Sequence, residues 1–566
     1  MIQRCSLAVL ALLIAGCSRT PPDWNGFASR YLDEYFNAHP EMGVYAGRHE
    51  FDGKLSDFSR EGMQREVARL HTARDRAAAF RDSDLTARQR FERQYVLAQI
   101  DGELFWREKA RWPFRNPAFY TASNSVNPIE GNVYLTRPYA PIEKRMAAFI
   151  AYERALPQAV QQIQSIMERP MPKSWIEIGH IGFGGMADYF EHDVPAIFAS
   201  VKDDRLQGDF RAANTAVVNA LRSFDGWLAG LRATATDNFA MGEQLFSGML
   251  RETERVELPL AQVEAAGKRD LERNLAALKK ACESYAPGAD LTACVGKQAA
   301  HKPAGDLLDV ARGQLTELKA FIVAKNLVSI PSDENALVAE APPYARWNFA
   351  YMDPVGPYEK GLPSVYYLSP PDPKWPAAEQ QAYVPGVTSL LFTSAHEIWP
   401  GHFLHFLHAN RTSFEFGRVF EGYGFTEGWA HYTEEMMWEA GLGDNSPEVH
   451  IGQLTQALLR NVRFLSAIGM HSGRMTVADS ERMFRESAFA DPGTARQQAA
   501  RGTFDPAYLN YTLGKLMIRK LREDWTAAKG GRAAWREFHD RFLDYGGPPV
   551  PLVRTELLGP NAGAAL

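Results

Sequence analysis

Apolar residues recur at spacings of three and four positions along most of the chain from residue 24 onward, with Arg, Lys and Glu between them. This period places the apolar side chains on one face of a helix, so it indicates amphipathic helices that bury that face. Strand-like stretches are few, and the best are residues 346–352 and 364–369. The pattern predicts helices over residues 59–82, 86–108, 142–168, 258–282, 303–326, 390–409, 425–440, 450–471 and 505–527.

Short segments rich in Pro and Gly, such as GLPSV, SPPDPKW and GGPPVP, separate the predicted helices. No internal repeat and no stretch with the composition of an interdomain linker interrupts the chain. We therefore predict a mainly α fold, a large helical ellipsoid with a central cleft and a small edge sheet. A single domain is expected to span residues 25–566.

The charge balance excludes some classes of partner. Lys and Arg total 62 against 68 Asp and Glu, a formal net charge of −6, whereas proteins that bind nucleic acid normally carry a basic excess or a basic stripe. Hydrophobic residues make up 45% of the chain, enough to bury a large core. Beyond the N-terminus no apolar run approaches the length that crosses a bilayer. We expect a globular protein without a nucleic-acid partner.

The N-terminal residues indicate export and lipid anchoring. Residues 1–16 combine one arginine, a short apolar stretch and small residues, as in a cleaved signal peptide. The segment Ile14-Ala15-Gly16-Cys17 resembles a bacterial lipobox, so Cys17 is expected to be acylated and to begin a tether over residues 17–24. Ser18 favours the outer membrane of the cell envelope, facing the periplasm, with the lipid as the only membrane contact. An ordinary signal peptide with an incidental Cys17 is the alternative.

Two cysteines remain after this processing, Cys282 and Cys294. In an oxidising periplasm a lone pair of cysteines twelve residues apart is suited to a disulfide that closes the intervening loop. Two free thiols are the alternative.

Candidate chemistry is concentrated after residue 390. The segment LLFTSAHEIWPGHFLHFLHAN holds four of the chain's 14 histidines. His396 and Glu397 begin like the metallopeptidase motif HExxH, in which two histidines four residues apart bind zinc and the glutamate activates water. Here the next histidine is His402, six residues on, which in a regular helix would lie about 240° around the axis.

Pro400-Gly401 offers a way to reconcile this spacing with a shared metal. Proline interrupts helical hydrogen bonding and glycine tolerates distortion, so we expect a two-residue bulge that returns His402 to the face of the first histidine. The later histidines, His405 and His408, are out of phase with that face. We interpret them as core or surface residues rather than as ligands.

A hydrolytic zinc site needs three protein ligands and an open position for water. The third candidate is Glu427, at the start of the next predicted helix in FEGYGFTEGWAHYTEEMMWEAG. Glu434 and Glu435 are its rivals, but they follow two turns later and fit a solvated face better. A structural histidine cluster without metal is the alternative for the whole constellation.

HEIWPGH followed by EGWAHYTEE resembles the bacterial family catalogued as domain of unknown function 885, over roughly residues 22–560. That family is similar to the gluzincin metallopeptidases. The resemblance implies zinc ligation by His396, His402 and Glu427, with Glu397 as the general base. It also implies that the strand SVYYLS is an edge strand near the metal, which would pair with an extended substrate.

Two further segments match the family pattern. RFLSAIGMHSGRMT carries Arg463 and His471, and PAYLNYTLGKLMIRKLRE carries Tyr511. The resemblance implies that Tyr511 or His471 donates a hydrogen bond to the oxyanion of the reaction. Tyr511 could instead be a buried aromatic residue, with Tyr508 in its place, and His471 a helix cap. Phe403 departs from the family, which usually has a second histidine at this position.

These observations favour a zinc peptidase that acts on short peptides. Cleavage near a C-terminus would need a cation for the terminal carboxylate, for which Arg463, Arg474 and Lys515 are candidates. A lipid-anchored binding or assembly protein on a degenerate peptidase scaffold is the alternative from another class. A metalloenzyme that hydrolyses a non-peptide amide or ester also stays open.

Overall fold

The computed structural model describes residues 23–121, 127–342, 346 and 349–566. Most of these residues are helical and one small sheet accompanies them, so the predicted mainly α fold with a small sheet is confirmed. Among the described residues, no helix has the length and apolar character needed to cross a membrane. The predicted signal peptide and the lipobox with Cys17 lie outside the described residues.

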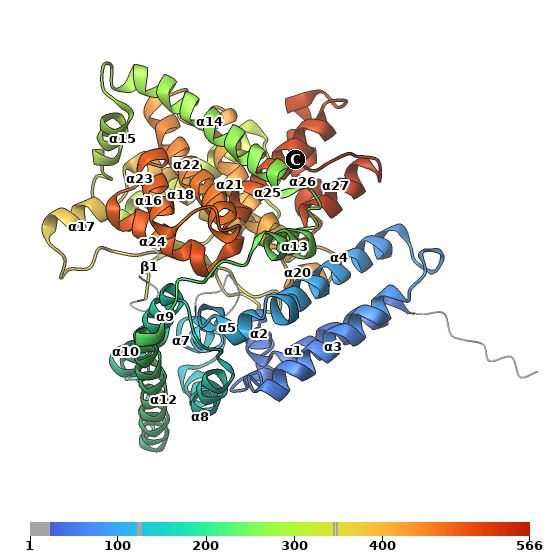
Figure 1. The fold of residues 1–566 in the computed structure, drawn as a ribbon, viewed down its shortest axis with the longest axis vertical. Helices are drawn as coiled ribbons and strands as arrows, with labels where there is room; N and C mark the ends of the chain where they lie inside the picture. The colour runs from blue at the N-terminus through green and yellow to red at the C-terminus, as the bar shows by residue number, and fades with distance from the viewer. Residues whose placement is uncertain (1–22, 122–126, 343–345, 347–348) are drawn as a thin grey trace, which may run out of the picture.

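The N-terminal helices form the lower part of the molecule in Figure 1. There α3 packs along α4, and α8 packs along the long helix α12. Helix α3 begins after Ser59, whose hydroxyl accepts a hydrogen bond from Gly62 N–H, and Thr86 and Gln89 form a capping box for α4. The helices are α1 (Trp24–Ala38), α2 (Pro40–Ala46), α3 (Arg60–Ala78), α4 (Ala87–Leu104), α5 (Trp112–Arg115), α6 (Ala118–Thr121), α7 (Asn132–Thr136), α8 (Ile142–Ile166), α9 (Lys173–Gly179), α10 (Gly185–His192), α11 (Val194–Ile197) and α12 (Asp204–Leu231).

The remaining helices form the upper part, with α22 at its centre. Every residue from 460 to 471 of α22 is buried, because α14, α18, α24 and α25 all pack on this helix. The helices are α13 (Glu243–Glu254), α14 (Leu260–Tyr285), α15 (Leu291–Ala300), α16 (Leu307–Lys325), α17 (Ala377–Tyr383), α18 (Val387–Glu397), α19 (His402–Ala409), α20 (Phe416–Val419), α21 (Tyr423–Glu439), α22 (Pro447–His471), α23 (Val477–Ser487), α24 (Pro492–Phe504), α25 (Asn510–Thr526), α26 (Trp535–Leu543) and α27 (Val550–Leu558).

Helices α21 and α25 lie unusually close together. A Cβ atom on Gly428 of α21 would lie 2.5 Å from the Cα atom of Gly514 of α25, so each position accepts only glycine. This contact brings the first turns of the two helices side by side, and those turns carry Glu427 and Tyr511.

The sheet has the strand order β1-β3-β2, formed by β1 (Leu337–Glu340), β2 (Ala350–Asp353) and β3 (Val365–Leu368). Strand β3 pairs in parallel with β1 and antiparallel with β2. The expectation that SVYYLS is an edge strand is therefore wrong, because both of its edges are occupied by neighbouring strands. It cannot add a substrate strand without losing one of them.

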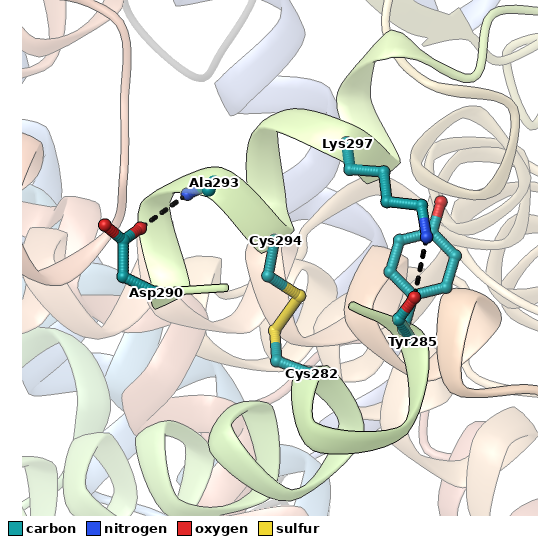
Figure 2. The surroundings of a disulfide bond; sticks show 6 residues. All are labelled: Cys282, Tyr285, Asp290, Ala293, Cys294 and Lys297. Atoms are coloured by element: carbon teal, nitrogen blue, oxygen red, sulfur yellow. Dashed lines mark hydrogen bonds between the residues drawn. A yellow bond between two sulfur atoms is a disulfide. The ribbon is translucent and has the colours of Figure 1, made fainter. Parts of the chain in front are cut away.

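The predicted disulfide is present. Cys282 near the end of α14 is bonded to Cys294 in α15, as Figure 2 shows. The loop between them is held further by Lys297, whose ammonium donates to the Tyr285 carbonyl at 2.7 Å. Asp290 caps α15 by accepting a hydrogen bond from Ala293 N–H.

Candidate metal centre

The histidine-rich segment is broken in the middle. Helix α18 ends at Glu397, the Trp399–Pro400 peptide bond is cis, and α19 begins at His402. A Cβ atom on Gly401 would lie 1.7 Å from the carbonyl oxygen of His396, so only glycine fits against the end of α18. The predicted bulge within one continuous helix is wrong, because the chain forms two helices here.

The break nevertheless brings the two expected histidines together. The ring centroids of His396 and His402 are 4.8 Å apart, and both side chains are buried. The Trp429 indole N–H of α21 donates to the Pro400 carbonyl at 2.9 Å, which holds the break against that helix. His402 therefore lies close to His396 as predicted, but a break between two helices brings it there instead of a bulge in one helix.

Glu427, in the first turn of α21, joins the two histidines. Its Oε2 atom lies 3.2 Å from His396 Nε2 and 3.3 Å from His402 Nε2. This buried oxygen has no hydrogen-bond partner in the described part of the chain. A tetrahedral ion with ligand bonds of about 2.0–2.1 Å holds its ligand atoms roughly 3.3–3.4 Å apart. The three side chains therefore fit the ligand set of a zinc ion.

Glu434, also in α21, contacts the ring nitrogen of His396 that does not face Glu427. It accepts a hydrogen bond from His396 Nδ1 at 2.7 Å, and it contacts His431 Nδ1 and the Arg460 guanidinium at 3.3 Å each. Donation from Nδ1 leaves His396 Nε2 free to bind a metal. Burial alone would raise the pKa of Glu434, but Arg460, His431 and His396 hold it below its usual value.

The prediction that Glu434 and Glu435 lie on a solvated face is wrong. Both are buried, Glu434 completely. Glu435 pairs with Arg273 at 2.8 Å and lies 3.5 Å from Lys515, whose ammonium also contacts Asp270 at 2.5 Å. The spacing of seven residues from Glu427 to Glu434 is two helical turns, a sequence signal that places the second glutamate on the face of the first.

Glu397 is the last residue of α18 and directly follows a candidate ligand. It is only partly buried, and no described residue forms a hydrogen bond with its carboxylate. Burial raises the pKa of Glu397, while His396 and His402 oppose the rise. A carboxylate that is accessible and unengaged is what a general base requires.

Tyr511 is brought to the site by the close packing of α21 and α25. Its hydroxyl donates to Glu427 Oε1 at 2.9 Å, and its ring lies 6.2 Å from that of His396. Tyr508 instead lies in the core beside Gly502, where a Cβ atom on the glycine would come within 2.3 Å of its hydroxyl. Tyr511 is thus the tyrosine that contacts the candidate ligands.

The catalytic role expected for His471 is not supported. Its Nε2 donates to the Gly502 carbonyl at 2.7 Å, Nδ1 accepts from Met241 N–H at 3.4 Å, and its ring stacks on Phe246. His471 follows Arg460 by eleven residues in α22, about 16 Å along the axis. Burial lowers its pKa to about 4, so it is a neutral core residue.

The structure places the two arginines that were expected to bind substrate in different environments. Arg474 lies beyond the end of α22 and pairs with Glu264 at 2.7 Å, with half of its side chain exposed, so the structure does not place it at the site. Arg463 lies one turn from Arg460, and its guanidinium carbon is 4.9 Å from the centre of the Tyr511 ring.

His405 and His408 contact backbone carbonyls and not the candidate ligands. His405 Nε2 donates to the Gly546 carbonyl at 2.8 Å, and His408 Nε2 donates to the Ser329 carbonyl at 2.9 Å. Burial lowers the pKa of His405 to about 3. The interpretation of both as structural residues agrees with these contacts.

A cavity of about 810 Å³ reaches the centre. Glu427, Thr426 and Tyr423 line one end, and the lining continues to Arg69 of α3 and Trp106 after α4. This volume is within the range of about 300–1,000 Å³ typical of ligand sites. The cavity therefore connects the candidate ligand Glu427 with the N-terminal helices.

Comparison with known proteins shows the same fold in two solved structures. A candidate lipoprotein of unknown function from Shewanella oneidensis is 20% identical, with a TM-score of 0.78 over 95% of this chain and 100% of that one. A candidate lipoprotein from Colwellia psychrerythraea is 17% identical, with a TM-score of 0.79 over 94% and 98% of the two chains. Among curated proteins the comparison finds no match. The model of one family, described as bacterial protein of unknown function (DUF885), matches residues 40–557, and the chain belongs to this family.

Proposed function

We propose that the protein is a zinc-dependent hydrolase that cleaves peptide bonds in short peptides. The observation that carries the proposal is the cluster of His396, His402 and Glu427, in which the buried Glu427 Oε2 atom faces both imidazoles and has no hydrogen-bond partner among the described residues. Bound there, zinc would supply a Lewis acid and an acidified water molecule.

The chain's own residues would divide the remaining work. Glu397, unengaged beside the ligands, accepts a proton from the attacking water and returns it to the leaving amine. Glu434 fixes the ring of His396, and the Tyr511 hydroxyl is near enough to donate to the substrate carbonyl oxygen as negative charge develops. The cavity favours short peptides over folded proteins because its volume admits only a few residues.

The general base separates this proposal from a binding protein on the same scaffold. We expect purified protein to hold about one equivalent of zinc and to cleave members of a pool of short peptides, followed by mass spectrometry. Glu397→Gln keeps zinc but loses at least about 100-fold in kcat, because the amide cannot accept the proton. Glu143→Gln, an exposed position in α8, is the matched control and keeps full activity.

Two outcomes would contradict the proposed peptidase activity. Zinc-loaded protein that leaves every peptide intact favours a binding protein. Hydrolysis of small esters or non-peptide amides alone favours a metalloenzyme with a non-peptide substrate. Equal activity of Glu397→Gln and the native chain would remove Glu397 from the mechanism.

We further propose that Cys17 is acylated and anchors the protein in the cell envelope at the outer membrane, facing the periplasm. The lipobox-like segment supports this proposal, and the two similar structures described above are of candidate lipoproteins. Cys17→Ser is expected to move the protein almost completely from the membrane fraction to the soluble periplasm, because bacterial lipoproteins depend on several acyl chains for anchoring. Unchanged partitioning on cell fractionation would contradict the anchor.

A further inference from the structure

Three guanidinium groups surround the ring of Tyr511, next to the candidate metal centre. The guanidinium carbons of Arg463, Arg460 and Arg501 lie 4.9, 5.6 and 5.9 Å from its centroid. Two of the three have carboxylate partners. Arg460 contacts Glu434 at 3.3 Å, and Arg501 contacts Asp505 at 2.9 Å.

Arg463 is the exception. Only 8% of the residue is exposed, and within the described residues it makes one hydrogen bond, from Nε to the neutral amide oxygen of Gln498 at 2.7 Å. Its two terminal nitrogens have no hydrogen-bond partner there, and they are not among the polar atoms that are both enclosed and without a partner, so each retains some solvent-accessible surface. A buried charge is normally paired, because removing it from water is costly.

Neighbouring positive charges further destabilise the charged form of Arg463. Burial lowers the pKa of Arg463, and the like charges of Arg501 and Arg460 lower it further, against the opposing influence of Tyr511 and Tyr423. A doubly charged ion at the adjacent ligand set would add more positive charge. An anion bound at Arg463 would relieve this accumulation.

The other two cations considered for a substrate carboxylate are already paired. Arg474 is bound to Glu264 near the surface, and Lys515 is completely buried against Asp270. A guanidinium presents parallel N–H groups that match the two oxygens of a carboxylate. Of these three cations, Arg463 is therefore the one that suits a carboxylate ligand and has no carboxylate partner among the described residues.

The position of Arg463 agrees with a substrate that reaches the ligands. The hydroxyl of Tyr511 bonds to Glu427, while the face of the same ring lies against Arg463. One tyrosine side chain thus spans the distance from ligand to guanidinium. This distance is comparable to one or two residues of an extended peptide, at about 3.5 Å each.

We infer that Arg463 binds the free C-terminal carboxylate of the substrate, so that the hydrolase removes residues from the C-terminal end of short peptides. This inference rests on the proposed function and deepens it by naming the end of the peptide that is recognised.

The test uses paired peptide pools of identical sequence, one with free C-terminal carboxylates and one with C-terminal amides. Equilibrium dialysis against zinc-loaded Glu397→Gln protein measures binding without hydrolysis, and cleavage by the native chain is followed in parallel. We expect the free acids to be retained and cleaved at least tenfold better than the amides. Amidated peptides with internal Asp or Glu should behave as amides, which distinguishes the terminal carboxylate from side-chain carboxylates.

Arg463→Gln should reduce retention of the acids to that of the amides, with zinc content and amide retention unchanged. Arg463→Lys should restore part of the preference, and Arg474→Gln, an exposed arginine paired elsewhere, should keep all of it. Equal retention of acids and amides by protein with an intact Arg463 would overturn the inference, whether or not Arg463→Gln folds. Absence of cleavage with retained acid preference would instead count against the proposed hydrolase and leave the carboxylate site standing.

Discussion

Two completely buried glutamates in different parts of the molecule behave in opposite ways. Glu434, in α21 next to the candidate metal ligands, contacts His396, His431 and Arg460, and these partners hold its pKa below the usual value despite burial. Glu153 lies in α8 of the N-terminal part, and neither of its carboxyl oxygens has a partner among the described residues. Burial raises the pKa of Glu153 to about 9.

The difference shows that burial by itself does not identify a functional carboxylate. At Glu153 the protein avoids a buried charge by keeping the group protonated, which leaves a neutral side chain with no electrostatic role. At Glu434 the protein keeps the charge and surrounds it with cations and imidazoles. A Glu434 carboxylate that stays charged although it is buried can orient and polarise His396.

Glu427→Ala should have the largest effect, because it removes one of three ligands. Loss of a residue that only hydrogen-bonds to a metal ligand typically lowers metal affinity about 10- to 100-fold. We expect Glu427→Ala to lower zinc affinity by more than about 100-fold and to abolish activity. Metal analysis after dialysis against a chelator measures the effect. Glu421→Ala, an exposed glutamate just before α21, should retain zinc. Full zinc in Glu427→Ala would show that another carboxylate is the ligand.

Two glycines compare how tightly the backbone is packed at the candidate metal ligands and in the N-terminal helices. Gly401→Ala should lower the free energy of unfolding by about 3 kcal/mol and weaken zinc binding, because its Cβ would strike the His396 carbonyl oxygen. Gly226→Ala in α12 meets no atom within 4 Å and should raise the free energy of unfolding by about 0.5–1 kcal/mol. Denaturant unfolding measures both. Native stability in Gly401→Ala would contradict the close approach.

Glu434→Gln tests the retained charge directly. We expect zinc affinity to fall about 10- to 100-fold, because the amide orients His396 less strongly than the carboxylate does. The neighbouring substitution Glu435→Gln should leave zinc affinity unchanged, since Glu435 pairs with Arg273 rather than with a ligand. Equal effects of the two substitutions in a metal competition assay would show that general loss of stability, and not orientation, is responsible.

Glu153→Gln should have the smallest effect on the site and a distinct effect on stability. The pKa of Glu153 is about 9 in the folded state, whereas the unfolded chain releases the proton near the ordinary glutamate pKa of 4.5. The stability contributed by the neutral group is therefore complete below pH 4.5 and is lost as pH rises towards 9. We expect Glu153→Gln to be about 3 kcal/mol more stable at pH 7, with a flatter pH profile and unchanged zinc affinity. An unchanged pH profile would mean that Glu153 is ionised in the folded state.

The sequence predicted the helical frame well, because amphipathic period is a local property. The segment 142–168 became α8 (Ile142–Ile166), and 450–471 lies within α22 (Pro447–His471). The motif segment likewise identified the three side chains that the fold brings together. The errors occurred where long-range packing decides, as at β3, which β1 covers on one edge and β2 on the other.

By itself the sequence determined which segments are helical and where the candidate metal ligands are concentrated, since both follow from residues close together in the chain. Only the tertiary structure decided the environment of that chemistry. Glu434 and Arg460 approach His396 from 38 and 64 residues away, and no local pattern shows which buried charges will meet. His471 and Arg463 lie on one helix eight residues apart, yet packing against different neighbours makes one a core residue and leaves the other without a carboxylate partner in the described part of the chain.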